Sequence, residues 1–141
     1  MKNITFAFLL MIAVTACRQQ PAQKTEDNGT PTTVTADTNV VNVYYFHGKQ
    51  RCKTCIAVGD IAKQTVDKAY AGNDRVHFAE INTSIPGNEA LIERYEVTWN
   101  ALIIARGDHS VEITRQAFAT AVENPQALDS LISNEINKRL Y

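Results

Sequence analysis

After residue 39, the positions of apolar and polar residues along the chain predict seven elements of secondary structure. Residues 40–46, VVNVYYF, form a β-branched and aromatic run, which is typical of a buried strand. Apolar residues then recur at helical spacing from Cys52 onward, and residues 76–81 alternate as a second strand would. The predicted strands are residues 40–46, 76–81, 101–105 and 111–113, and the predicted helices are residues 52–69, 88–95 and 125–140. Asn124 followed by Pro125 is a typical helix start, which supports the last of these helices.

This β-α-β-α-β-β-α order indicates an α/β fold with a mixed central sheet of about four strands and helices on both faces. Because helical crossovers separate the first three strands, we expect these three to be parallel neighbours. Gly107-Asp108 is a turn signal, so we expect the last two strands to form a hairpin.

The first 17 residues predict export. Lys2 and Asn3 precede an apolar run at residues 4–14, which is shorter than the ~20 residues that a membrane-spanning helix needs. Residues 14–17, VTAC, resemble the bacterial lipobox, whose cysteine is lipidated and becomes the mature N-terminus. We therefore expect a lipoprotein signal peptide over 1–17, lipidation of Cys17, and a domain that faces the periplasm or the exterior from the cell envelope. An ordinary secretory signal or a short anchor helix are the alternatives.

Residues 18–39 are rich in Thr, Gln, Asn, Asp and Pro, and such a segment cannot bury enough apolar surface to fold. We expect a flexible tether there and a single folded domain over 40–141. The formal net charge of −1 and the lack of a basic stripe argue against a nucleic-acid partner. The expected partners are the membrane, through the lipid, and a protein redox partner, with the chain itself a monomer.

The cysteines carry the candidate chemistry. Of the three, a lipidated Cys17 could not form a disulfide, which leaves Cys52 and Cys55 in a C-x-x-C motif between a predicted strand and a predicted helix. At a helix start, unpaired N–H groups and the helix dipole stabilise a thiolate, and Arg51 and Lys53 act in the same direction. We predict Cys52 as the catalytic nucleophile and Cys55 as the resolving thiol.

Three other interpretations of the motif compete. It could be a structural disulfide, although a bridge that closes so short a loop adds little stability. It could be half of a zinc site, but no second C-x-x-C is present and the three histidines do not show ligand spacing. A haem attachment site would need His where Ile56 stands. We expect no metal and no cofactor.

From about residue 40 to 141 the chain resembles the thioredoxin superfamily. The resemblance rests on the strand that ends in Tyr45-Phe46, the C-x-x-C that follows it, the strand around residues 78–82, and the stretch 95–104. It implies a dithiol–disulfide activity with Cys52 as the attacking thiol, which makes a thiol-disulfide oxidoreductase the expected enzyme class. Three departures favour a dedicated carrier over a general reductase: Ala101 replaces the cis-proline of the family, Tyr45 replaces a buried acid, and Arg51 replaces an aromatic residue.

The combination of residues 43–47, VYYFH, and 51–55, RCKTC, looks most like the nitrophenyl compound nitroreductase subunit family, which is associated with bacterial arsenical-resistance clusters. That resemblance implies electron delivery to a nitroreductase. The alternative function is a redox-partner subunit without a substrate of its own, or a protein that binds a metal or an arsenical through the same thiolates.

Several further residues are candidates for the site. We expect Trp99, Asn100 and Ala101 to form the substrate-binding edge beside the dithiol, although Trp99 could equally be a half-buried loop aromatic. His47, in the loop before Cys52, could tune the thiols or have no role. Glu80, on a strand expected to be central, could be an internal acid or point outward.

Overall fold

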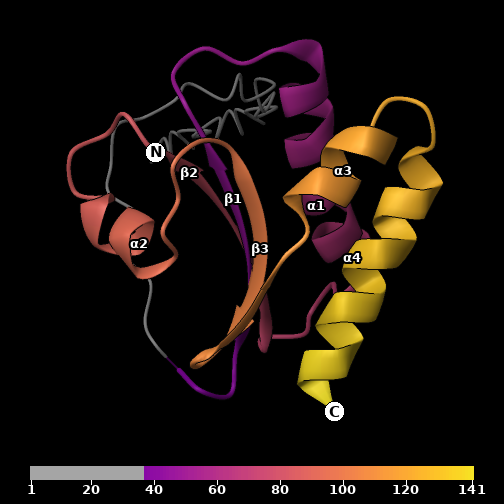
Figure 1. Ribbon diagram of the computed structural model, residues 1–141. Helices are drawn as coiled ribbons and strands as arrows, with labels where there is room; N and C mark the ends of the chain where they lie inside the picture. The colour runs from indigo at the N-terminus through magenta and orange to yellow at the C-terminus, as the bar shows by residue number, and fades with distance from the viewer. Residues whose placement is uncertain (1–36) are drawn as a thin grey trace, which may run out of the picture.

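The structure, a computed structural model, describes residues 37–141 as one α/β domain in three layers. A four-stranded sheet forms the middle layer, with α2 on one face and α1, α3 and α4 on the other (Figure 1). The elements are β1 (Val41–His47), α1 (Lys53–Ala69), β2 (Val76–Asn82), α2 (Glu89–Arg94), β3 (Ala101–Arg106), β4 (His109–Glu112), α3 (Thr114–Thr120) and α4 (Pro125–Leu140). The predicted signal peptide, Cys17 and nearly all of the predicted tether lie outside the described residues.

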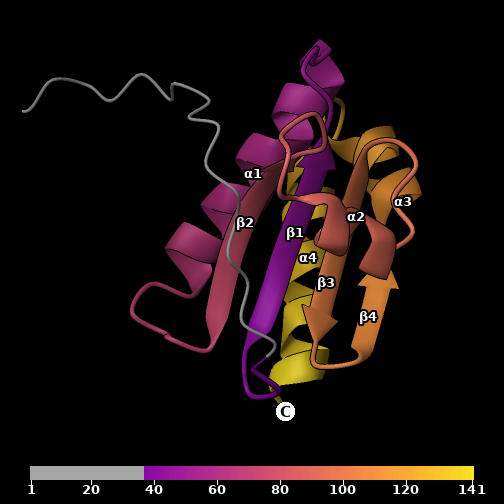
Figure 2. The ribbon, with the colours of Figure 1, turned by 90° about the vertical axis from the view of Figure 1, so that its left-hand side faces the viewer.

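The strand order is β2-β1-β3-β4, and Figure 2 shows it from the side of α2. β1 runs parallel to β2, whereas β3 runs antiparallel to β1 and forms a hairpin with β4. The mixed sheet and the hairpin are confirmed, but the prediction that the first three strands are parallel was wrong. The six residues of α2 span only ~9 Å, too little to return the chain along a seven-residue strand of ~23 Å. β3 therefore begins at the end of the sheet where β2 finishes.

A second difference is α3, a seven-residue helix that the hydrophobic pattern did not predict. It has no side-chain cap, and only Ala117 within it is fully buried, so its sequence carries neither a start signal nor a long apolar stripe. Tertiary packing holds it instead, because Ala117 and the following Ala121 lie in the core between the sheet and α4.

The core is divided by the sheet into two clusters, because successive residues of β1 point to opposite faces. Val41, Val43 and Tyr45 lie with the helices α1, α3 and α4, whereas Tyr44 and Phe46 lie on the side of α2. The last helix has the apolar stripe expected of a helix that packs on a sheet, with Leu128, Leu131, Ile132, Ile136 and Leu140 on one face; all but Leu131 are buried. Both faces of β1 are thus covered, which fixes the strand that leads into the C-x-x-C motif.

The predicted start of the last helix is also confirmed. The side chain of Asn124 accepts a hydrogen bond from the backbone N–H of Ala127 at 3.2 Å, and Pro125 is the first helical residue. None of the helices within residues 37–141 combines the length and the hydropathy needed to cross a bilayer.

Glu96 is the one non-glycine residue of the described chain with a positive φ, at 51°. It closes the turn after α2, where the next N–H, that of Val97, donates to the Ile92 carbonyl at 2.9 Å. A side chain in this conformation costs about 1 kcal/mol, so Glu96→Gly should raise the free energy of unfolding by about 0.5–1 kcal/mol. Urea denaturation measures the change. Glu96→Ala is the matched control, because alanine loses the same carboxylate but keeps the Cβ, and an equal gain in both variants would contradict the argument.

Candidate redox site

The C-x-x-C motif lies at the start of α1, directly beyond the end of β1. Cys52 is the N-cap residue, with extended backbone angles, and its sulfur accepts a hydrogen bond from the N–H of Cys55 at 3.2 Å. The two cysteines form a disulfide, with their Cα atoms 5.0 Å apart. Cys52 is exposed, whereas Cys55 is 5% exposed. The predicted helix start is confirmed, and the exposed first sulfur and buried second sulfur are the arrangement that an attacking and a resolving thiol require.

Tyr45, on β1, contacts the C-x-x-C motif through its hydroxyl group. Its hydroxyl donates a hydrogen bond of 2.7 Å to the carbonyl oxygen of Cys55. Burial raises the pKa of the Tyr45 phenol, and this effect outweighs the opposite influence of the Arg51 guanidinium. Tyr45 therefore stays a neutral donor at physiological pH, so it positions Cys55 but cannot take a proton from its thiol as a buried carboxylate could.

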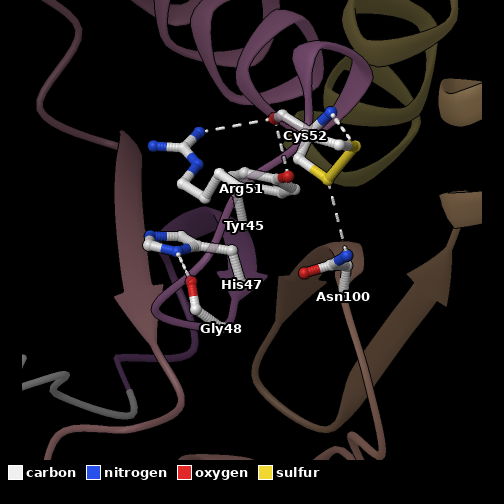
Figure 3. The surroundings of a disulfide bond; sticks show 7 residues. Tyr45, His47, Gly48, Arg51, Cys52 and Asn100 are labelled. Atoms are coloured by element: carbon white, nitrogen blue, oxygen red, sulfur yellow. Dashed lines mark hydrogen bonds between the residues drawn. A yellow bond between two sulfur atoms is a disulfide. The ribbon is translucent and has the colours of Figure 1, made fainter.

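Arg51 reaches the same carbonyl from the other side (Figure 3). One terminal nitrogen, Nη2, lies 3.3 Å from the Cys55 oxygen, and the other, Nη1, lies 2.6 Å from a carboxylate oxygen of Glu80. The guanidinium carbon is 5.5 Å from the centre of the Tyr45 ring, which is cation–π range. The third nitrogen, Nε, is buried without a hydrogen-bond partner. The Arg51 side chain is only 23% exposed, so its charge is only partly screened by solvent.

Gly59 makes room for that guanidinium. A Cβ on this residue would lie 2.7 Å from Nη2 of Arg51 and 2.9 Å from the Tyr45 ring. Glycine in the middle of a helix costs about 1 kcal/mol relative to alanine, so its presence in α1 is explained by the close approach of these two side chains. Sequence reasoning missed this residue, and its one signal was a glycine inside an otherwise regular helical pattern.

His47 and Glu80 complete the group of polar side chains around Arg51. Nε2 of His47 lies 3.4 Å from Glu80, and Nδ1 lies 2.8 Å from the carbonyl oxygen of Gly48. His47 was predicted in a loop, but it is the buried last residue of β1. The expectation that Glu80 lies on a central strand was wrong, because β2 is an edge strand. Glu80 is the register partner of Tyr45 in a parallel pair, so it projects toward α1, with about a third of its side chain exposed (34%).

The predicted substrate-binding edge lies on the opposite side of the disulfide. The side-chain amide of Asn100 is 3.8 Å from the Cys55 sulfur, so this residue is brought to the site (Figure 3). Ala101 follows as the buried first residue of β3, and no peptide bond within residues 37–141 is cis. Trp99 is 79% exposed rather than half-buried. That these three residues bind a substrate stays a prediction.

Metal-ligating side chains do not gather in the part of the chain that the structure describes. Within residues 37–141, no group of three or more His, Cys, Asp or Glu side chains is arranged to hold an ion.

Comparison with known proteins defines the fold. No protein-family model and no curated protein matches the chain. Among solved structures, human ERp44 in its zinc-bound form has a TM-score of 0.51 at 16% identity, over 69% of this chain and 27% of that one. A structure described as that of a malarial protein has a TM-score of 0.38 at 23% identity, over 72% of this chain and 99% of that one. The chain thus corresponds to about a quarter of ERp44. Together with the mixed sheet and the C-x-x-C at the start of α1, this likeness shows a thioredoxin-like fold.

Proposed function

We propose that this protein is a thiol–disulfide redox protein that exchanges electrons with a dedicated protein partner through Cys52 and Cys55. One observation carries the proposal: an exposed sulfur at a helix N-cap is paired with a buried sulfur one turn further along, in a thioredoxin-like fold. A disulfide needed only for stability gains nothing from an exposed position at a helix start, where a thiolate is stabilised.

The exchange has two steps. The Cys52 thiolate attacks a disulfide of the partner, forming a Cys52–partner bond and releasing one partner thiolate. The Cys55 thiol then loses its proton and attacks the Cys52 sulfur, which forms the Cys52–Cys55 disulfide and releases the second partner thiolate. Two electrons pass to the partner, one partner thiolate takes up the proton that Cys55 releases, and the other is protonated from the solvent. The same steps run in reverse when a partner dithiol reduces the Cys52–Cys55 disulfide.

The place of the site in the domain suits a protein anchored by a lipid at Cys17. The chain enters the domain near Thr38, whose carbonyl accepts a hydrogen bond of 2.8 Å from Arg106. This point lies before β1, whereas the dithiol follows β1, so the length of that strand, ~23 Å, separates them. A tether of about 22 residues has an r.m.s. reach of ~25 Å. An anchor at Cys17 would therefore be joined to the end of the domain opposite the dithiol, which leaves the dithiol accessible to a partner.

The partner that we propose is of the nitroreductase type, with the protein delivering electrons as a subunit of such a system. The support is the resemblance of residues 43–47 and 51–55 to the nitroreductase subunit family. The site also departs from a general protein-disulfide reductase. A neutral Tyr45, hydrogen-bonded to the carbonyl oxygen of Cys55, takes the place of a buried acid. The side-chain amide of Asn100 faces the Cys55 sulfur, and the peptide bond that follows Asn100 is trans. Both features favour a redox protein with one dedicated partner over a reductase that acts on many proteins.

Equilibration with glutathione buffers tests the redox proposal. We expect the Cys52–Cys55 disulfide to open reversibly, with a potential between about −120 and −270 mV, the range of dithiol carriers. Trapping with an alkylating agent and mass spectrometry measures the reduced fraction, with the Cys52→Ser, Cys55→Ser double variant as the blank. A potential well below about −300 mV, together with a Cys52 thiol that does not react with the alkylating agent after mild reduction, would identify a structural bridge instead.

A further inference from the structure

Arg51 is an unusual residue to find beside the start of a helix. The N-terminus of a helix carries a partial positive charge, so a cation there is destabilising in itself. The side chain is nevertheless 23% exposed and donates to the carbonyl oxygen of Cys55, inside the first turn of α1. Other parts of the protein must therefore hold the Arg51 guanidinium at the N-terminus of α1, where the helix dipole alone disfavours a cation.

Three features of the fold hold it. Glu80 binds Nη1 at 2.6 Å from the neighbouring strand β2. The Tyr45 ring lies under the guanidinium, and the missing side chain of Gly59 leaves the space above it. Since Nε is buried without a partner, hydrogen bonding by itself does not account for the position. The slot is built from three elements, β1, β2 and α1, and all three converge on one guanidinium.

The two redox states of the dithiol differ in how they use this charge. Reduction of the disulfide consumes two electrons and one proton to give a Cys52 thiolate and a Cys55 thiol. The disulfide is neutral, so a nearby cation does little for it. The thiolate is an anion at the helix N-cap, and Arg51 is the residue directly before it, with its guanidinium on the carbonyl oxygen of Cys55, so this charge would stabilise the reduced state selectively.

We propose that Arg51 is a positioning residue of the redox site, locked between Tyr45, Gly59 and Glu80 so that its charge stabilises the Cys52 thiolate. Glu80 has two opposed effects in this arrangement. It holds the guanidinium in place, and its own negative charge offsets part of the field that the thiolate experiences. The assignment deepens the proposed function, on which it rests for its biological meaning, but the thiolate itself can be measured whether or not the dithiol exchanges with a partner.

The test compares Arg51→Gln, Glu80→Gln and Lys53→Gln after reduction with dithiothreitol and removal of the reductant. The absorbance of the thiolate near 240 nm, followed against pH, gives the thiolate fraction. We expect Arg51→Gln to lower the thiolate fraction at neutral pH about three- to tenfold and Glu80→Gln to raise it, because the two substitutions remove charges of opposite sign. Lys53→Gln is the matched control, since it removes one positive charge next to Cys52 from an exposed side chain. Its smaller effect should vanish in 0.5 M salt, whereas the effect of Arg51→Gln should persist.

A thiolate fraction that does not fall in Arg51→Gln, or that falls no more than in Lys53→Gln, would overturn the assignment and leave Arg51 a purely structural residue. If Arg51→Gln does not fold, Gly59→Ala decides, because its added Cβ would lie 2.7 Å from Nη2 and displace the guanidinium without removing its charge. The thiolate fraction should then fall at neutral pH, and an unchanged fraction would overturn the assignment. Equilibration of the unmodified protein with glutathione is measured in parallel. Failure of that exchange with intact thiolate shifts would reject the proposed function and keep the role of Arg51.

Discussion

Replacing Cys55 with serine should turn a transient mixed disulfide into one that lasts for minutes to hours. The exposed Cys52 would still attack a partner disulfide, but the buried thiol that normally displaces the partner would be absent. Without an internal thiol, the bond can be broken only by uncatalysed rearrangement, which is slow. Serine is close to cysteine in size, so the contacts of Tyr45 and Arg51 with the residue 55 carbonyl oxygen should survive.

An aromatic disulfide that releases a coloured thiolate gives a direct measurement. Cys55→Ser should release one equivalent of colour and keep the other half of the reagent attached, as mass spectrometry would show. Unmodified reduced protein should release two equivalents and end as the Cys52–Cys55 disulfide. Cys52→Ser is the matched control and should react slowly at the site, since Cys55, the thiol that the site retains, is 5% exposed. Equal rates and equal trapping in the two variants would show that the cysteines do not have separate roles.

The same variant, expressed in cells and isolated without reductant, addresses the partner. A dedicated carrier should accumulate one dominant mixed disulfide, whereas a general reductase should accumulate many. A spread of captured proteins would therefore count against the single partner that the site geometry suggests, while leaving the redox chemistry itself in place.

Gly59→Ala should lower the free energy of unfolding by about 1–3 kcal/mol, although the same change at an exposed helical position raises it by about 1 kcal/mol. The added Cβ would lie 2.7 Å from Nη2 of Arg51 and 2.9 Å from two carbons of the Tyr45 ring. Arg51 could swing away, but the Tyr45 ring is fully buried and cannot move freely. Either Arg51 leaves its slot, and its ion pair with Glu80 with it, or α1 shifts away from β1.

Urea denaturation of a double-mutant cycle separates these causes. Arg51→Ala removes one of the two clashing side chains, so the destabilisation by Gly59→Ala should be smaller in the Arg51→Ala background by about 0.5–2 kcal/mol. Independent, additive effects would mean that Gly59 accommodates Tyr45 alone. A stabilised Gly59→Ala protein would show that the slot does not exist as described.

Much of the fold could be predicted because it depends on local signals. The apolar run of β1, the helical stripe of α4 and the cap at Asn124 are each written in a few consecutive residues, and the structure confirms them. The direction of β3 could not be obtained in this way. It depends on the length of α2 and on the face that α2 covers, and the hydrophobic pattern around residue 88 shows neither.

The same division runs through the site. Cys52 and Cys55 at the start of a helix could be recognised from a motif and its context, because the chemistry of that motif is local. The surroundings of the sulfurs could not, since Tyr45, Glu80 and Asn100 come from three different strands or their ends and meet only in the folded sheet. His47 is an example. The strand was predicted to end at residue 46, but β1 includes His47, which is therefore a buried neighbour of Glu80 and not a loop residue.

A C-x-x-C dithiol at the start of a helix in a mixed α/β domain could be predicted from the amino-acid sequence, because hydrophobic periodicity and short motifs act over a few residues. The partly buried position of Arg51 beside this dithiol, in contrast, could be seen only in the folded chain. That position depends on a carboxylate 29 residues away in the chain, on a strand that pairs in register with β1, and on a missing Cβ in the facing helix. Charges brought together by sheet pairing and helix packing have no signature in the local sequence, and in this protein they surround the sulfurs that carry the proposed chemistry.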